Sequence, residues 1–249
     1  LPTLELFGFE WDGPVLRQST RQSRYREAIE QLSATGQLFR CACSRRDISA
    51  APGQLGPRCI GRCAARQSLI PEGDSALRFA AGADIQLDFP DLWQGPQSVA
   101  CAALGDVVLR RRDGLHAYQL AVVVDDADQG VNQVVRGADL LASTPWQILL
   151  QRSLGLAQPG YGHLPLLLEP DGRKLSKSQR SAALQPARAA NQLYETLRLL
   201  QQSPPADLAG AAVAEIWPWA LANWQPAALV GQRALRAPAA GASVSPPGV

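Results

Sequence analysis

The sequence predicts an α/β protein with a doubly wound sheet, on three observations. Apolar residues make up 46 % and charged residues 18 % of the 249 residues, which suits a globular protein with a sizeable core and excludes a mostly disordered chain. Short apolar runs typical of buried strands alternate with segments of helical periodicity. Two of these runs, residues 120–124 and 164–168, are apolar throughout, as expected of strands covered on both faces of a parallel sheet.

The first half of the chain is expected to supply one helix and two strands. The apolar spacing from Tyr25 to Leu32 predicts an amphipathic helix that Gly36 can end. Residues 75–81 and 99–110 are predicted to be strands. The second strand ends in an arginine run at 110–112, which is either a patch that contacts phosphate or the exposed end of a hairpin.

The second half continues the alternation. Residues 115–126 contain the first apolar run and are predicted to form a strand buried on both faces. Residues 131–135 predict another short strand. Thr144 and Pro145 then open a helix with a capping box and proline at its first position, and Gly155 closes it.

The C-terminal part reads as helices followed by a tail. One apolar stripe contains Leu193, Leu197 and Leu200, and a second runs over residues 208–219. The small, proline-containing residues 237–249 are expected to be disordered. No apolar stretch reaches membrane-spanning length and the first residues do not resemble a secretion signal, so we expect a cytoplasmic protein.

Four of the five cysteines gather in a short stretch, as Cys41, Cys43, Cys59 and Cys63. In a cytosolic protein such paired spacing favours a metal site over disulfides, and four thiolates can surround Zn²⁺ tetrahedrally. Because no open coordination position is evident, the zinc would be structural. Two disulfides, or reduced thiols in a core, are the alternatives.

The two lysines of the chain stand three residues apart, whereas the other 22 of its 24 basic residues are arginines. Lys174 and Lys177 flank Ser176 in a stretch that follows the predicted strand 164–168. Ammonium groups and hydroxyls in such a loop suit a triphosphate, whose charge they would neutralise as pyrophosphate leaves. The alternative is an exposed basic turn.

Taken together, these stretches are similar to a known family. Residues 174–178, Lys-Leu-Ser-Lys-Ser, resemble the KMSKS-type signature of the class I aminoacyl-tRNA synthetases. Residues 118–141, 143–145 and 163–166 resemble the glutamyl-type branch of that family, and the similarity runs from about residue 9 to about residue 224. Since only 71 residues follow Ser178, too few for an anticodon-binding domain, the chain most resembles the short glutamyl-Q tRNA(Asp) synthetases.

The resemblance implies a Rossmann-like class I synthetase catalytic domain with a zinc-bearing insertion and a C-terminal helical region. The expected parts are the remainder of the first Rossmann half at 1–40, the zinc-binding insertion with connecting strands at 41–115, the second Rossmann half at 116–190, the C-terminal helices at 191–236 and the tail at 237–249.

The resemblance also implies roles for individual residues. Tyr118 and Arg136 would bind glutamate, and a guanidinium suits a carboxylate because it can donate two parallel hydrogen bonds. Lys177 and Ser176 would contact ATP, with Lys174 beside them, and the two lysines would be catalytic. The family's zinc ligands are usually three cysteines and a tyrosine; here Cys59 stands at the tyrosine position, which leaves a site of four cysteines.

The resemblance implies that the protein activates glutamate with ATP and Mg²⁺. It then transfers the glutamyl group to the queuosine base of tRNA(Asp). We expect a monomer with no membrane partner. The family's N-terminal segment with a HIGH-type ATP motif has no counterpart in these residues, so we expect the chain to be N-terminally shortened, without about half of the adenylate site. Two alternatives remain: a zinc-stabilised RNA-binding relic, and a fragment of a glutamyl-tRNA synthetase.

Overall fold

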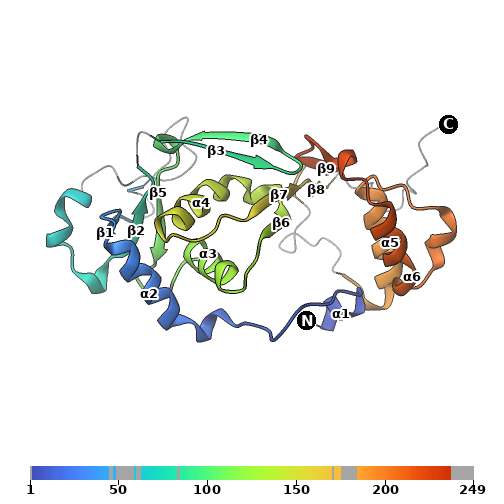
Figure 1. The fold of residues 1–249 in the computed structure, drawn as a ribbon, viewed down its shortest axis with the longest axis horizontal. Coiled ribbons are helices and arrows are strands. Elements are labelled where there is room, and N and C mark those ends of the chain that lie inside the picture. The colour runs from blue at the N-terminus through green and yellow to red at the C-terminus, as the bar shows by residue number, and fades with distance from the viewer. Residues whose placement is uncertain are drawn as a thin grey trace.

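The main sheet of the protein has four strands (Figure 1). The structure is a computed structural model, and it describes residues 2–44, 47–48, 59, 63–82, 85–169, 171–174 and 184–236. The order across this sheet is β4 (Gly95–Ala100), β3 (Gln86–Asp91), β7 (Gly160–Leu164) and β6 (Gln133–Gly137). The β3–β7 and β7–β6 pairs are parallel, whereas β4 pairs antiparallel with β3, so the sheet is mixed.

A second sheet carries Cys41, the first of the five cysteines, at one end. It is antiparallel and consists of β1 (Leu38–Cys41), β2 (Ala76–Ala80) and β5 (Asp106–Arg110), with β2 in the middle. β1 ends at Cys41, and β2 confirms the strand predicted at 75–81. The arginines after β5 lie in a turn closed by a hydrogen bond from the Gly114 amide to the Arg111 carbonyl, 3.0 Å long, so the hairpin-end prediction is correct.

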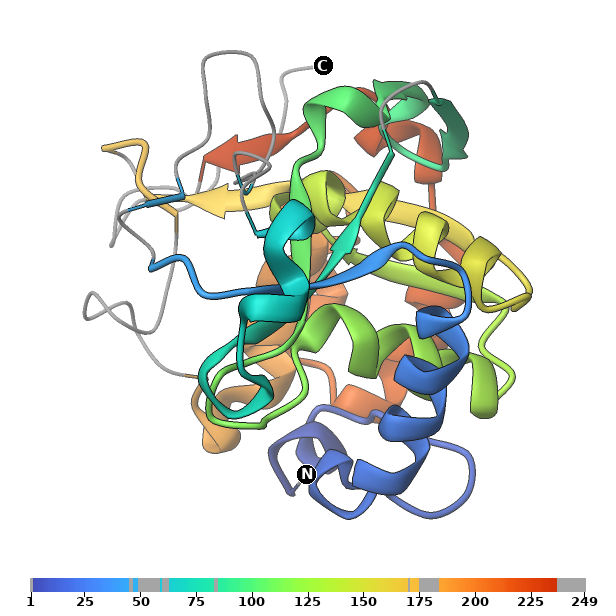
Figure 2. The ribbon, with the colours of Figure 1, turned by 90° about the vertical axis from the view of Figure 1, so that its left-hand side faces the viewer.

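Three helices form the core with these sheets: α2 (Gln22–Ser33), α3 (Tyr118–Asp128) and α4 (Thr144–Ser153). Both ribbon views show α3 between α2 and α4 (Figure 1, Figure 2). α2 buries the predicted apolar face and α4 begins where the sequence predicts, so both helices are confirmed. The fully buried side chains they contribute include Tyr25, Leu32, Leu120, Val124, Ile148 and Leu150.

The predicted strand at 115–126 is wrong, because its apolar run lies in helix α3. The buried apolar residues are Leu120, Ala121, Val123 and Val124, a spacing that places them on one face of a helix. A short apolar run fits a strand or a buried helix equally well by periodicity. Contacts with α2 favour the helix, since Asp125 accepts hydrogen bonds from Tyr25 and Arg21 at 2.7 Å each.

Two other predicted strands are interrupted. The segment 99–110 contains the end of β4, a 3-10 turn at Cys101–Ala103 and β5, so it is not one strand. The segment 164–168 is divided by Pro165, which has no backbone N–H for a strand ladder, into the end of β7 and a separate strand β8 (Leu166–Leu168).

The capping box predicted for α4 is also wrong. Ser143 is the N-cap residue and its side chain makes no capping hydrogen bond, while Thr144 is already helical. The Thr144 hydroxyl instead accepts a hydrogen bond from Arg136 at 2.8 Å. The side chain expected to cap the helix therefore serves the site described below.

The C-terminal part holds α5 (Ala189–Leu199), α6 (Val213–Asn223) and a short strand β9 (Ala234–Arg236). The two helices pack at the far end of the molecule (Figure 1), where Leu193, Leu197 and Ile216 are buried as predicted. Leu200 and residue 208 lie outside these helices, so the predicted stripes are correct only in part. β9 runs parallel to β8, and the N-terminal α1 (Pro2–Leu6) lies beside α6 (Figure 1).

Candidate functional site

Arg136 and His163 lie side by side on neighbouring strands. In the parallel register of β6 and β7 they are direct partners. Arg136 Nε donates a hydrogen bond to His163 Nε2 at 3.0 Å, and Arg136 Nη2 donates to the Thr144 hydroxyl at 2.8 Å. Two strands and the first residue of α4 therefore fix one guanidinium.

A carboxylate at the end of β3 holds the other side of His163. Asp91 Oδ2 lies 2.5 Å from His163 Nδ1, and both side chains are fully buried. Burial acts to raise the pKa of Asp91, but the hydrogen bonds from His163 and from backbone N–H groups outweigh it and lower the pKa. Burial lowers the pKa of His163 against the pull of Asp91. The arrangement is thus an ionised carboxylate bound to a neutral imidazole.

Arg136 makes contact with an aromatic ring, and Asp126 lies within electrostatic range of its charge. Its guanidinium carbon lies 5.6 Å from the centre of the Tyr161 ring, a cation–π arrangement. Within the described ranges, no carboxylate forms an ion pair with Arg136. A half-buried guanidinium held by neutral acceptors can bind the carboxylate of a ligand.

Tyr118 belongs to the same neighbourhood. It is the first residue of α3 and 48 % exposed. Burial raises the pKa of the Tyr161 hydroxyl, with further influence from Arg136, Asp126 and Tyr118, so these groups lie within electrostatic range of one ring. Burial also raises the pKa of Asp126, which Arg136 opposes. Tyr118 and Arg136, the two side chains predicted to bind glutamate, and Asp126 thus all act electrostatically on the Tyr161 ring.

Lys174 lies near the end of β6, the strand that carries Arg136. It bridges to Leu168 at the end of β8, and its ammonium forms an ion pair with Asp139, three residues after Arg136. The hydrogen bond from Lys174 lowers the pKa of Asp139. Lys177 and Ser176, the other predicted ATP contacts, lie outside the described residues. Of the predicted set, the structure therefore brings Lys174 to the end of the strand that carries Arg136.

The four cysteines predicted to bind zinc form one cluster. Their sulfur atoms all lie within 4.8 Å of one another, and Cys43 Sγ lies 3.9 Å from Cys59 Sγ and 3.4 Å from Cys63 Sγ. None is in a disulfide. Tetrahedral zinc with Zn–S bonds of about 2.3 Å separates its sulfurs by roughly 3.8 Å, so the cluster could hold such an ion. The Cys59 backbone N–H donates to Asp106 at 2.8 Å, which ties the cluster to β5.

Two thiols of this cluster, Cys43 and Cys59, resist ionisation, whereas Cys63 ionises more readily than usual. Burial, followed by interactions with neighbouring cysteines, raises the pKa of Cys43, and burial raises that of Cys59 to about 11. The backbone of Ala42 and the neighbouring sulfurs lower the pKa of Cys63 against its burial. A bound divalent cation reverses the cost of charging thiols, because it stabilises thiolates directly.

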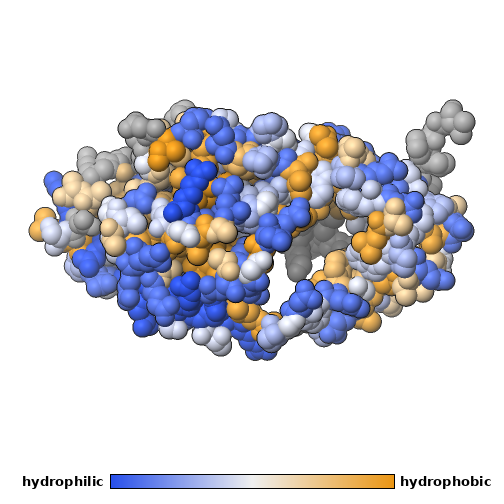
Figure 3. Space-filling view, in the orientation of Figure 1, coloured by the Kyte–Doolittle hydropathy of each residue, from blue (hydrophilic) through white to orange (hydrophobic). Residues whose placement is uncertain are grey.

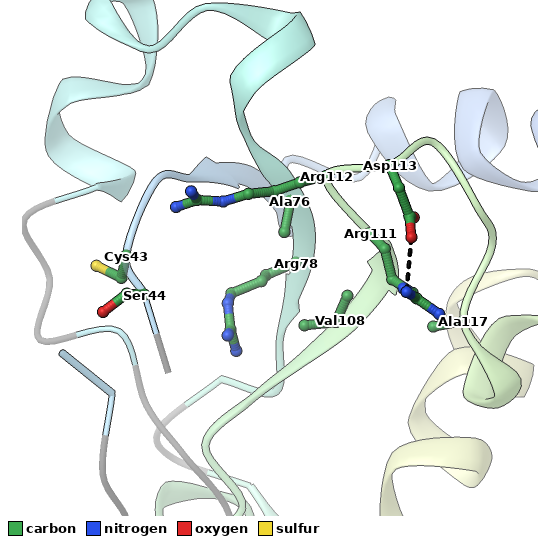
Figure 4. Close-up of a pocket in the computed structure, with 9 residues that line it drawn as sticks. All are labelled: Cys43, Ser44, Ala76, Arg78, Val108, Arg111, Arg112, Asp113 and Ala117. Atoms are coloured by element: carbon green, nitrogen blue, oxygen red, sulfur yellow. Dashed lines mark ion pairs between the residues drawn. The ribbon is translucent and has the colours of Figure 1, made fainter. Parts of the chain in front are cut away.

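A basic pocket adjoins the cysteine cluster, with a volume of about 670 Å³. Figure 4 shows Arg78 between the Cys43 side of the pocket and Val108, with Arg112 and the ion pair of Arg111 with Asp113 around it. Arg78 is only 8 % exposed, and its Nε is buried without a hydrogen-bond partner in the described part of the chain. Three arginines against one aspartate make this pocket attractive to anions.

Comparison with known proteins now decides the family. The family described as class I tRNA synthetases (E and Q), catalytic domain, matches residues 1–201. The chain belongs to this family. It therefore has the predicted class I synthetase catalytic fold, and it is a ligase of the aminoacyl-tRNA synthetase type.

The relatives also agree with the predicted group. A protein of Dechloromonas aromatica named glutamyl-Q tRNA(Asp) synthetase is 50 % identical over 233 residues, which cover 90 % of this chain and 75 % of the relative. One of the same name from Ectopseudomonas mendocina is 47 % identical over 225 residues and is covered to 74 %. The solved glutamate–tRNA synthetase of Elizabethkingia anophelis shares the fold, with a TM-score of 0.70 and 22 % identity, and this chain spans 57 % of it.

Sequence reasoning about this synthetase missed three residues of the site: Asp91, Thr144 and Asp126. Thr144 was assigned to a helix cap, and Asp126 to the end of a strand. His163 was part of the family resemblance but received no role, although it is one of two histidines in the chain. Asp91 gave no local signal, because its partner is 72 residues away.

In the described residues, no helix combines the length and hydrophobicity that a bilayer crossing requires.

Proposed function

We propose that this synthetase activates glutamate with ATP and transfers the glutamyl group to the queuosine base of tRNA(Asp), in the cytoplasm. The observation that carries the proposal is the guanidinium of Arg136, which is fixed on three sides and has no ion-pair partner in the described residues. Its position beside Tyr118 and Lys174 suits a carboxylate ligand next to a nucleotide. The names of the relatives supply the identity of the amino acid and the RNA.

Activation is a displacement at phosphorus. The α-carboxylate of glutamate attacks the α-phosphorus of ATP, a new C–O–P linkage forms, and pyrophosphate leaves with the electron pair of the broken P–O bond. In the second step the queuosine base takes the glutamyl group and AMP leaves. The protein contributes mainly by positioning the reactants and by neutralising charge.

Arg136 and Tyr118 would hold glutamate, and the loop that contains Lys174, Ser176 and Lys177 would hold the triphosphate. The ion pair of Lys174 with Asp139 supports this arrangement, because it anchors the start of that loop three residues from Arg136. Mg²⁺ would accompany ATP as its usual counterion.

The cysteine cluster fits structural zinc: four sulfur donors lie at spacings suited to tetrahedral coordination. Cys41, Cys43, Cys59 and Cys63 would hold the metal and so order the insertion. The basic pocket next to the cluster supports an RNA partner, since phosphodiesters are the anions that such arginines bind.

Pyrophosphate exchange with glutamate and ATP tests the proposal. We expect exchange without tRNA. Arg136→Ala should raise the KM for glutamate roughly 100-fold, the effect of losing about 3 kcal/mol of charge-assisted binding. Lys177→Ala should abolish exchange. Arg26→Ala, which removes an exposed arginine of α2, is the matched control and should leave exchange unchanged.

Glutamylation assays distinguish the remaining candidates. We expect transfer to tRNA(Asp) with queuosine and none to the same tRNA without the modified base. Charging of tRNA(Glu) would identify a glutamyl-tRNA synthetase instead. RNA binding with no exchange at any glutamate concentration would identify a non-catalytic relic, and an unaffected Lys177→Ala variant would also contradict the proposal.

A further inference from the structure

Three strands of the main sheet contribute to one chain of hydrogen bonds. Asp91 at the end of β3 binds His163 on β7, and His163 binds Arg136 on β6, at 2.5 Å and 3.0 Å. The Asp91 and His163 side chains are fully buried. Burying a carboxylate and an imidazole costs desolvation free energy, which indicates that the pair has a specific role.

The two carboxylate oxygens of Asp91 have different hydrogen-bond partners. Oδ1 accepts hydrogen bonds from the backbone N–H groups of Trp93, Gln94 and His163, at 3.1, 2.9 and 3.1 Å. Oδ2 faces His163 Nδ1. An ionised carboxylate only accepts hydrogen bonds, so Nδ1 must carry the proton.

The tautomer of His163 follows, and it determines how Arg136 is held. With the proton on Nδ1, the neutral imidazole presents a lone pair at Nε2, which is what the Arg136 Nε–H requires. The Nε–H and one Nη2–H of Arg136 are thereby used inside the protein. Arg136 Nη2 also donates to the Leu140 carbonyl at 3.5 Å. Within the described residues Nη1 has no hydrogen-bond partner, so its N–H groups remain for a ligand.

We propose that Asp91 and His163 are positioning residues that set the orientation of the Arg136 guanidinium for the carboxylate of the amino acid substrate. The inference rests on the proposed function, which assigns glutamate binding to Arg136. The carboxylate of Asp91 selects the imidazole tautomer, and the tautomer selects the direction of the guanidinium. Groups that orient a metal-binding side chain in this way typically change affinity or activity 10–100-fold when altered, and we expect the same range for this guanidinium.

Asp91→Asn is the decisive variant, because the structure dictates how the amide must lie. The three backbone donors require an oxygen at the position of Oδ1, so the NH₂ group takes the place of Oδ2. It then donates to Nδ1 and forces the proton onto Nε2, where it opposes the Arg136 Nε–H. We expect the KM for glutamate in pyrophosphate exchange to rise roughly 10–100-fold, with kcat and the KM for ATP changed less than about threefold.

A matched control loses a buried hydrogen bond to a carboxylate elsewhere. Tyr25→Phe removes the bond to Asp125, 2.7 Å long, and should lower stability without changing the KM for glutamate. If Asp91→Asn lowers kcat and raises both KM values by similar factors, the role of Asp91 is only structural. That result would overturn the inference.

A measurement on the unaltered protein avoids any folding defect of the variant. Nitrogen NMR of the histidine rings should show Nδ1 protonated and Nε2 unprotonated for His163 at neutral pH, and a His116→Gln sample assigns the signals because the chain has only two histidines. Protonated Nε2 would overturn the inference. If Arg136→Ala leaves the KM for glutamate unchanged, the proposed binding role fails; if only Asp91→Asn leaves it unchanged, the positioning role fails alone.

Discussion

The two histidines of the chain are both held neutral by their surroundings. His163 lies in the buried network described above, and burial lowers its pKa against the opposing charge of Asp91. His116 lies against the Tyr25 ring, with ring centres 5.4 Å apart, and its Nδ1 is 2.7 Å from Gln22 Oε1. Burial is the main cause of its lowered pKa, followed by Arg110 and Arg26. Protonating either ring therefore costs more in the folded chain than in the unfolded one.

Acid destabilisation below neutral pH is the prediction that follows. Below the ordinary histidine pKa of about 6.5, the unfolded chain binds protons that the folded chain does not, so stability falls as the pH decreases through this window. The thermal midpoint should decrease from pH 7.5 to pH 5.5, as measured by circular dichroism. His116→Asn should make that decrease smaller, and an unchanged pH slope in this variant would contradict the assignment.

At the scale of an element, the insertion between β1 and β2 depends on its cysteine cluster. Its local core consists of Phe39, Cys41, Ile48, Cys59 and Cys63, too few apolar side chains to replace a larger core. The link from Cys59 to Asp106 and the hydrogen bond from Arg112 to the Ala42 carbonyl then attach it to β5 and the turn beyond. The cysteine cluster is thus expected to hold both the described residues of the insertion and the adjoining side of the basic pocket in place.

Removal of the metal should destabilise this element. We expect one equivalent of zinc per chain in protein purified under reducing conditions, and less than about half an equivalent in Cys63→Ala. Zinc at 100 times its dissociation constant contributes about 2.7 kcal/mol to stability, which a chelator would remove and calorimetry would detect. Cys101→Ala changes a buried thiol outside the cluster and should retain the full equivalent. Full zinc content in Cys63→Ala would refute the four-cysteine site.

Helices in which apolar and polar residues alternate with a clear helical period could be predicted from the sequence, and a helix without polar interruption could not. α2 has charged residues on its exposed face, so its apolar face stood out, whereas the run in α3 has no polar interruption and was read as a strand. The site divides similarly. Tyr118, Arg136 and Lys174 lie in family motifs, but Asp91 acts across the sheet through a register that no local pattern encodes.

At the scale of the whole molecule, the N-terminal segment joins the two ends of the protein. Trp217 on α6 donates a hydrogen bond to the Phe7 carbonyl at 2.8 Å, and its ring packs edge-on against Phe9 at 5.3 Å. The chain then runs back to α2 (Figure 1), and the surface is hollowed between the main body and the C-terminal helices above this segment (Figure 3). The position of the C-terminal helices depends in part on this contact.

Gly8 makes that contact sterically possible, and a matched pair of variants tests it. A Cβ at Gly8 would lie 2.7 Å from Trp217 Nε1, whereas at Gly13 it would meet nothing within 4 Å. Both glycines have positive φ, +78° and +69°, so the backbone strain of an alanine is similar. Gly8→Ala should therefore cost about 1–3 kcal/mol more than Gly13→Ala in thermal unfolding, and equal costs would show that the contact is unimportant.

One glycine also lies between Arg136 and the ion pair of Asp139 with Lys174, the residues proposed to serve the amino acid and the nucleotide. A Cβ at Gly137 would lie 2.6 Å from Asp139 Oδ1 and 3.3 Å from the Leu166 side chain. The bare backbone here lets the carboxylate fold back against the strand, where it receives Lys174. A single added methyl would therefore push away the anchor of the lysine loop while leaving the arginine next to it untouched. At this point of the chain, one hydrogen atom in place of a side chain leaves room for the Asp139 carboxylate that pairs with Lys174.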